Sequence, residues 1–198
     1  MAIQYTDINR IKRVCNHEAG HYIVARELSF KTHGIAVLFN PMQGHAGHAV
    51  IEPWTPNITS ITELTGYLER RIKVLFAGAI SEAMEVTGKY DADFAYNEWK
   101  TGASTNDHSK IRELVQTLRN IEYPQTTDEP TAQIELTEID EKLIQQTGEI
   151  VHKRIELIHG IGDLLFQKVK EYNVKYELFE TEINMVKQIR ELYIDKIL

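Results

Sequence analysis

Residues 17–21 read HEAGH, with two histidines four positions apart and a glutamate beside the first of them. On an α-helix this spacing places His17 and His21 on one face, one turn apart. Two imidazoles at that spacing can bind a metal ion, and Glu18 can serve as the general base for water. The pentapeptide therefore predicts a hydrolytic zinc site. The alternative is an amphipathic helix on which both histidines are solvated or capped.

The sequence around this pentapeptide favours a half-buried helix from residue 6 to residue 29, capped by Thr6 or Asp7. The histidines lie near its apolar side, where unpaired imidazoles would be costly, and this favours the metal site. Gly20 inside the helix costs about 1 kcal/mol relative to alanine, which suggests close approach of another backbone. The apolar residues at helical spacing are Ile8, Ile11, Val14, Cys15, Ala19, Tyr22, Ile23 and Leu28.

The composition suits one domain with a full hydrophobic core, or one domain plus a helical appendage. The chain has 198 residues, of which 42% are hydrophobic, and a formal net charge of −7. It has no run of basic residues, which argues against a nucleic-acid partner. Cys15 is the only cysteine, so neither an intrachain disulfide nor a zinc–thiolate cluster can form, and a reducing compartment is expected.

The sequence also bears on location and energy supply. Residues 1–10 contain no apolar signal core, and the longest apolar run lies around residues 74–80. A membrane span needs roughly 20 apolar residues, so we expect a cytoplasmic protein without one. No Walker-type phosphate-binding loop occurs in the sequence, so any ATPase that acts with this protein is expected to be a separate chain.

The order of the expected elements indicates a mainly α fold with a small β-hairpin beside the HEAGH helix. We expect one domain over residues 1–198, with a metal-site core over 1–123 and C-terminal helices over 135–198. The hairpin would pair residues 34–39 with residues 47–51. The other expected segments are a loop over 53–57, a helix over 60–86 closed by Gly88, an irregular stretch over 89–101, a helix from Ser104 or Thr105 to 121, a polar loop over 125–131, a helix from 137 to about 172 that Gly148, Gly160 and Gly162 could bend, and a last helix from about 178 to 197.

A catalytic zinc usually takes three protein ligands, so one must come from outside the HEAGH helix. The candidates are Glu82, Asp91, Asp93, Asp107 and His108. Asp107 is favoured, because the positive end of a helix would stabilise the ionised carboxylate that binds metal. Asp107 can equally be an ordinary acid at a helix start, and the other candidates stay open on the residues alone.

Three motifs in the same order resemble the peptidase domain of the FtsH family of ATP-dependent zinc proteases. They are HEAGH at residues 17–21, FAGAISEAM at 76–84 and TGASTND at 101–107. The later segments TEIDEKLIQQTGEIVHKRIELI and LFETEI resemble the final helices of that family. The resemblance implies an FtsH peptidase-domain-like fold, Asp107 as the third zinc ligand, a hairpin edge that an extended substrate can join, and a homo-oligomer.

The chain departs from the family pattern in several places. The membrane anchor and ATPase module of the family do not occur in this sequence. Thr105 is an extra residue within TGASTND, and Ala79 follows Gly78 where the family has arginine. Residues 120–130, NIEYPQTTDEP, replace a glycine- and methionine-containing stretch, which bears on substrate handling more than on zinc binding.

Together these features predict a zinc-dependent endopeptidase that acts on unfolded polypeptides or short peptides, alone or with a separate ATPase chain. His17, His21 and Asp107 would hold Zn²⁺, and Glu18 would be the catalytic base. Glu82 could orient one of the histidines, or it could be an ordinary helix acid. The alternative function is a catalytically weak or inactive zinc-binding interaction or assembly domain derived from such a peptidase.

The other histidines and the cysteine have simpler expected roles. His45 and His48 are expected to be polar turn residues rather than an accessory metal site. His152 and His159 are expected to be surface histidines. Cys15 is expected to be a small buried core residue rather than an oxidation sensor.

Overall fold

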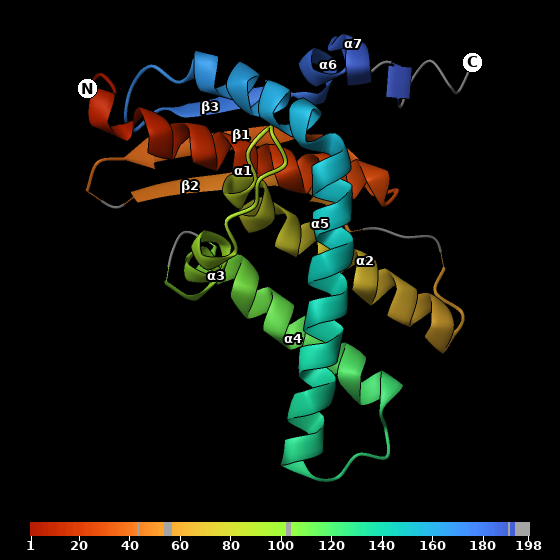
Figure 1. Cartoon of the computed structure of the whole chain (residues 1–198). Helices are drawn as coiled ribbons and strands as arrows, with labels where there is room; N and C mark the ends of the chain where they lie inside the picture. Colours follow the sequence, from red (N-terminus) through yellow and green to blue (C-terminus); the bar gives the residue numbers. More distant parts are fainter. Residues whose placement is uncertain (43, 54–56, 102–103, 190, 193–198) are drawn as a thin grey trace.

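A computed structural model describes residues 1–42, 44–53, 57–101, 104–189 and 191–192 (Figure 1). The described chain is mainly helical with one small three-stranded antiparallel sheet, which confirms the expected mainly α class. Most of the expected loop over 53–57 and the end of the expected last helix lie outside the described residues. The elements in chain order are η1 (Tyr5–Asp7), α1 (Ile8–Glu27), β1 (Lys31–Asn40), β2 (Gly44–Glu52), α2 (Ile61–Ala83), α3 (Ala92–Thr101), α4 (Thr105–Glu122), α5 (Glu129–Lys168), β3 (Lys175–Phe179), α6 (Glu180–Ile183) and α7 (Lys187–Ile189).

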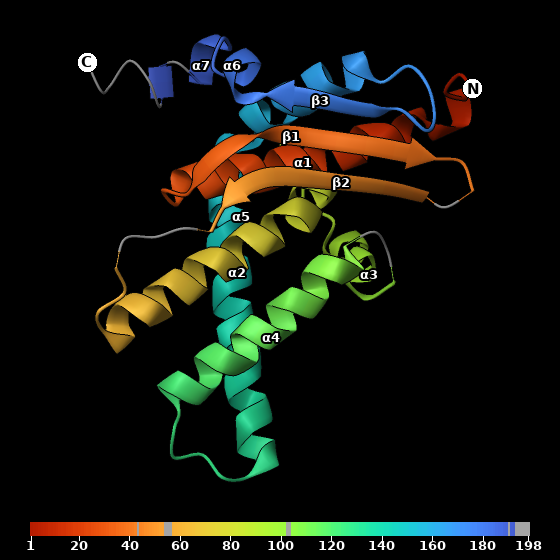
Figure 2. The ribbon, with the colours of Figure 1, turned by 180° about the vertical axis from the view of Figure 1, so that it is seen from behind.

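The HEAGH helix, α1, is the central element of the fold. It contacts β1 and β2 as well as α2 and α5, and the two opposite views in Figures 1 and 2 show it between these elements. Residues 17–25 are all buried, as expected for a helix covered on several sides. At Gly20 an added Cβ would lie 2.8 Å from the carbonyl oxygen of Ala77 in α2. This confirms the close backbone approach expected at Gly20.

The sheet has the strand order β2-β1-β3, which makes β2 an edge strand. β1 and β2 pair antiparallel from Lys31 opposite Glu52 to Asn40 opposite Gly44, so the expected hairpin is present and longer than expected. Gly44 has φ +92°, a conformation that favours glycine and closes the turn. The hairpin lies against α1, which brings an open strand edge close to the HEAGH residues.

The expected second helix is α2, and its start is well defined by the sequence. The Ser60 hydroxyl accepts the Glu63 N–H, and the Glu63 carboxylate accepts the Ser60 N–H, which together form a capping box. The helix ends at Ala83 rather than at residue 86, because Met84 becomes extended and forms a β-bridge with Tyr90.

The stretch expected to be irregular, residues 89–101, contains the helix α3, so that prediction is wrong. Asp91 accepts a hydrogen bond of 2.9 Å from the Phe94 N–H at the start of this helix. Ala95 and Trp99, one turn apart, are buried, and the Trp99 ring packs edge-on against Phe76 of α2 with 5.2 Å between ring centroids. Two buried positions are too few to give a clear helical period in the sequence.

The prediction of a helix from residue 178 is also wrong for the start of that segment. Residues 175–179 form β3, which pairs antiparallel with β1 so that Leu178 lies opposite Ile35. The described chain then continues into the short helices α6 and α7. Strand pairing between segments so far apart in the sequence leaves no local periodic signal, whereas the pattern after residue 178 favours a helix.

The longest helix, α5, starts at Glu129 rather than residue 137 and ends at Lys168. Asp128 caps it by accepting the Thr131 N–H, and a proline in its first turn fits a helix start. α4 and the first part of α5 form an arm that points away from the sheet in both views (Figures 1 and 2). Residues 120–130, which depart from the FtsH pattern, lie at the tip of this arm.

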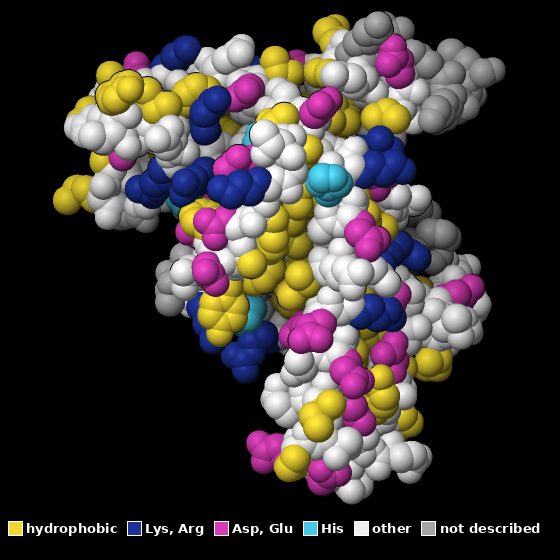
Figure 3. All heavy atoms as spheres, in the orientation of Figure 1, with side chains coloured by type: hydrophobic (Ala, Val, Ile, Leu, Met, Phe, Trp, Pro, Cys, Tyr) yellow, Lys and Arg dark blue, Asp and Glu magenta, His cyan; other side chains and the backbone are white. Residues whose placement is uncertain are grey.

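Acidic and apolar side chains gather on different parts of the surface. Figure 3 shows acidic side chains along the arm and an exposed apolar band beside α5. The apolar band includes a groove between α2 and α5 lined by Ile80, Met84, Tyr90 and Ile144. No helix in the described part of the chain is long and apolar enough to cross a membrane.

A half-buried carboxyl on α5 gives a test of the fold through pH. Burial raises the pKa of Asp140 from 3.8 to about 6, and its Oδ1 has no hydrogen-bond partner among the described residues. The folded state therefore binds this proton more tightly, and the free energy of unfolding falls as pH rises between about 4 and 6. Asp140→Asn should stabilise the fold at pH 7 by about 1 kcal/mol, allowing for solvent screening, and by almost nothing at pH 4.

Urea denaturation at pH 4 and pH 7 measures this effect. Glu138→Gln removes a charge from an exposed residue on the same helix and serves as the control. An equal gain for Asp140→Asn at both pH values would show that burial of the ionised form is not the cause.

Candidate metal centre

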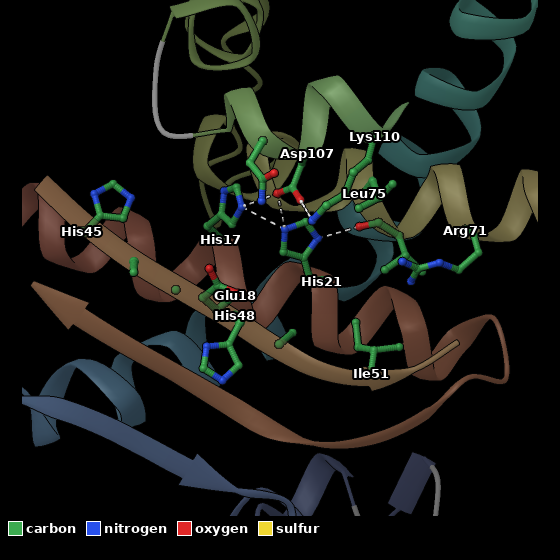
Figure 4. A pocket seen from close by; sticks show the side chains of 15 residues that line it. His17, Glu18, His21, His45, His48, Ile51, Arg71, Leu75, Asp107 and Lys110 are labelled. Atoms are coloured by element: carbon green, nitrogen blue, oxygen red, sulfur yellow. Dashed lines mark hydrogen bonds and ion pairs between the residues drawn. The ribbon is translucent and has the colours of Figure 1, made fainter. Parts of the chain in front are cut away.

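Three side chains from two helices converge between α1 and α4 (Figure 4). His17 and His21 come from consecutive turns of α1, and Asp107 comes from the first turn of α4. The Nε2 atoms of the two histidines are 2.9 Å apart. Asp107 Oδ2 lies 3.1 Å from the Nε2 of His21 and 3.4 Å from the Nε2 of His17. The two histidines are buried, the aspartate is partly buried, and the group could hold a metal ion.

The hydrogen bond made by the Nδ1 of each imidazole determines which ring nitrogen faces the other candidate ligands. His17 Nδ1 lies 2.7 Å from the Glu82 carboxylate, and His21 Nδ1 lies 2.6 Å from the Val74 carbonyl oxygen. Both partners can only accept a hydrogen bond when Glu82 is ionised, so each Nδ1 is a donor. In the neutral imidazoles both Nε2 atoms then carry a lone pair, which is the form that binds metal.

The donor set fits a divalent metal ion. Two imidazole lone pairs and a carboxylate oxygen are electron-rich atoms that repel one another unless a proton or a metal cation lies between them. A tetrahedral ion with bonds of about 2.0–2.1 Å holds its ligand atoms roughly 3.3 Å apart. The observed separations of 2.9, 3.1 and 3.4 Å lie around that value. The three side chains therefore already have the spacing that such an ion requires.

Gly78 of α2 leaves the space in which these ligand atoms lie. A Cβ added to Gly78 would be 2.4 Å from His17 Nε2 and 2.6 Å from His21 Nε2. Any side chain at this position would therefore displace the imidazoles or occupy the position between them. The glycine thus keeps one wall of the candidate site open to both histidines.

Neighbouring charges and burial shift the pKa in opposite directions at two of the candidate ligands. Burial alone would lower the pKa of His17, but the Asp107 and Glu82 carboxylates outweigh it and hold that pKa well above its usual value. Burial alone would raise the pKa of Asp107, but the two imidazoles hold it well below its usual range. Asp107 is therefore ionised, as a metal ligand must be, and metal binding at His17 would displace a proton.

Glu18 lies on α1 between the two histidines and faces β2 (Figure 4). Its side chain is buried, and Oε2 has no hydrogen-bond partner among the described residues. Its other oxygen lies against Gly47, where an added Cβ would be 2.2 Å away. Burial raises the pKa of Glu18, although the two histidines partly offset this effect. A buried carboxyl with a raised pKa and a free oxygen is suited to take a proton from water.

The candidate ligands lie at the floor of an open cavity of about 420 Å³ between β2, α2 and α4. One wall is the edge strand β2, so an extended polypeptide could enter alongside it. The residues that line the cavity are His17, Glu18, His21, His45, Ala46, Gly47, His48, Ala49, Ile51, Arg71, Val74, Leu75, Asn106, Asp107 and Lys110.

The other candidate ligands lie elsewhere. Asp91 caps α3, and neither Asp93 nor His108 belongs to a group of three metal-binding side chains within the described residues. His45 and His48 lie in β2 rather than in a turn, which corrects their expected position. Both line the cavity, and His45 Nδ1 accepts a hydrogen bond of 3.3 Å from the Arg10 guanidinium.

The remaining predictions concern residues outside the cavity. Cys15 is fully buried, and burial raises the pKa of its thiol, so it is the core residue that was expected. His152 is exposed, as expected. His159 is half-buried instead, and its Nε2 lies 3.0 Å from the Met84 carbonyl oxygen.

Two charged residues that line the cavity, Arg71 and Lys110, were not predicted from the sequence. Both share a helix face with residues of the site. Arg71 precedes Gly78 and Glu82 on one face of α2, at intervals of seven and eleven residues, and Lys110 follows Asp107 by three residues on α4. This spacing identifies them as site residues only once the fold shows which face of each helix borders the cavity.

Glu82 offers a test of how the site is held. Its carboxylate is 5% exposed and orients His17. Glu82→Ala should weaken zinc binding by about 10- to 100-fold, the usual effect of losing a hydrogen bond to a ligand imidazole. Competition titrations with a chromophoric chelator measure the affinity. Glu85→Ala, an exposed acid just beyond α2, is the control, and unchanged affinity in Glu82→Ala would refute this role.

No family model matches this chain, and no curated protein matches it. The resemblance to FtsH therefore stays a prediction.

Proposed function

We propose that this protein is a zinc-dependent metallopeptidase that hydrolyses peptide bonds in unfolded polypeptides or short peptides. The single observation that carries the proposal is the convergence of His17, His21 and Asp107 at the floor of an open cavity that also contains Glu18. Structural zinc sites are usually closed by four protein ligands, whereas catalytic sites use three and keep one position open. The described residues provide three.

The donor types favour zinc, with iron as the competitor. Two imidazole nitrogens and one carboxylate oxygen are a common set for catalytic zinc. The same set with open positions also binds Fe(II) in oxygenases. Glu18 favours hydrolysis over oxygen chemistry, because a general base beside the open position is what activation of water requires.

The roles of the side chains follow from their positions. A divalent ion bound by the three ligands would supply a Lewis acid that makes water nucleophilic near neutral pH and polarises a peptide carbonyl. Glu18 would accept the proton of the attacking water and later donate it to the leaving amine nitrogen. Glu82 and the Val74 carbonyl would keep the two imidazoles oriented. The edge of β2 would align the substrate backbone.

The proposal extends to the setting in which the enzyme acts. An FtsH-like peptidase in the cytoplasm would receive unfolded chains, or it would depend on a separate ATPase chain to unfold them. We also infer a homo-oligomer, as the FtsH resemblance implies. Residues 120–130 depart from the family pattern, but they lie at the tip of the arm in Figures 1 and 2 and do not line the cavity.

A peptidase assay with purified zinc-loaded protein tests the function. Unfolded casein and a fluorogenic peptide should both be cleaved, and a chelator should abolish the activity until zinc is restored. Binding of zinc without cleavage of either substrate would instead favour the alternative, an inactive zinc-binding assembly domain.

A further inference from the structure

The cavity has two cationic side chains at its rim, Arg71 from α2 and Lys110 from α4. Figure 4 shows both extending from their helices toward His21. The only carboxylates among the described lining residues are Glu18 and Asp107, which the proposed function uses as base and ligand. The rim is therefore positively charged, although the chain as a whole carries a formal charge of −7.

A contact with an aromatic ring, rather than an ion pair with a described residue, positions Arg71. Its guanidinium carbon lies 5.8 Å from the centroid of the Phe30 ring, a cation–π contact that orients the group. Within the described residues, no carboxylate forms an ion pair with it. The residue is partly buried, so its N–H donors lose some hydration. A planar guanidinium in this position is suited to bind a carboxylate through two parallel hydrogen bonds.

Lys110 contributes a second charge from the α4 side of the cavity. Its Nζ lies 3.7 Å from Asp107 Oδ1, the carboxylate oxygen that does not face the imidazoles. The side chain is about half exposed, at 51%, so it can move toward a second anion. An anion between Arg71 and Lys110 would be neutralised from both sides, close to the candidate metal ligands.

We propose that Arg71, assisted by Lys110, binds a carboxylate of the substrate near the bond that is cleaved. The carboxylate belongs either to an acidic side chain or to the C-terminus of the polypeptide. This inference rests on the proposed peptidase function and adds the class of substrate, namely peptides with a negative charge close to the cleavage point. Binding of such a charge next to the metal would discriminate against neutral and basic peptides.

Matched peptides test the proposal with the zinc-loaded full chain. One series is acetylated and amidated and carries a single glutamate at successive positions, and each member has a glutamine counterpart. A second pair differs only in having a free or an amidated C-terminus. We expect kcat/KM to be about 10-fold higher for the glutamate peptide at one position, or for the free C-terminus, the scale of one charge-assisted contact. The two series distinguish the two sources of the carboxylate.

The matched variants are Arg71→Gln and Arg70→Gln. Arg70 precedes Arg71 on α2 and also lies near Phe30, at 6.0 Å, but it does not line the cavity. Arg71→Gln should erase the preference for the charged peptide, whereas Arg70→Gln should keep it. The preference should also weaken at high salt. Cleavage without a preference, or a preference that survives Arg71→Gln, would overturn the inference and leave the peptidase proposal intact.

A binding measurement separates this inference from the peptidase proposal. Fluorescence anisotropy of the same labelled peptides with the Glu18→Gln protein reports affinity without turnover. Tighter binding of the charged peptide, lost in Glu18→Gln combined with Arg71→Gln, would support the carboxylate site even if no peptide were cleaved. Equal affinity for the charged and neutral peptides, or no binding of either, would overturn it.

Discussion

Glu18→Gln should abolish peptide hydrolysis while the protein keeps its zinc. Glutamine has nearly the same shape but cannot accept a proton from water, and loss of a general base typically costs about 10²- to 10⁴-fold in rate. The ligand atoms of His17, His21 and Asp107 are untouched by this change, so metal content should remain at about one zinc per chain. The measurement is kcat for a fluorogenic peptide beside metal analysis of the same sample.

The folding control for this variant follows from burial. Burial raises the pKa of Glu18, so the ionised form makes the metal-free fold less stable at neutral pH, and a neutral glutamine should not lower the melting temperature of the metal-free protein. Loss of activity together with a lower melting temperature would point to misfolding. Activity within a few-fold of wild type in a folded, zinc-loaded Glu18→Gln protein would refute the role of Glu18 as the base.

Asp107→Ala should remove the metal. This change deletes one of three ligand atoms, so zinc affinity should fall by more than the roughly 10- to 100-fold expected for a residue that only orients a ligand. Thermal unfolding reports the same loss by linkage, since a ligand present at about 1,000 times its Kd stabilises the fold by roughly 4 kcal/mol. Chelation should therefore lower the melting temperature of wild type and leave that of Asp107→Ala unchanged.

Asn106→Ala is the matched control, because Asn106 also lines the cavity and precedes Asp107 in the same turn. It should retain zinc and the response to chelation. Tight zinc binding in Asp107→Ala, combined with its loss in Glu82→Ala, would show that the carboxylate ligand had been assigned to the wrong residue. It would also mean that the first turn of α4 leaves the site when metal binds.

The sequence was most informative about α1 and the cavity around it. Helical spacing alone placed His17 and His21 on one face, and Gly20 alone indicated the close approach of another backbone, which is α2. Asp107 was favoured by its place in a first helical turn, and the structure brings it within 3.4 Å of both imidazoles. These features are local, because each depends on a few neighbouring residues with unusual chemistry or spacing.

The features that could not be predicted depend on distant contacts. β3 exists because Leu178 pairs opposite Ile35 of β1, and nothing in the local pattern after residue 175 indicates that partner. Among residues 92–100 of α3, only Ala95 and Trp99 are buried, which is too few to give a recognisable helical period. Arg71 became a candidate only when the fold showed which face of α2 borders the cavity. In each case tertiary packing, and not local propensity, determines the structure or the place of the residue.

Zinc K-edge X-ray absorption of the purified wild-type chain tests the central claim most directly, because it reports the metal and its ligands together. Our account predicts a zinc edge at about one ion per chain, with imidazole nitrogen and oxygen neighbours at about 2.0–2.1 Å and no sulfur neighbour. A protein that shows no zinc edge after incubation with zinc, or zinc bound through sulfur at about 2.3 Å, would contradict the assignment of His17, His21 and Asp107 as its ligands.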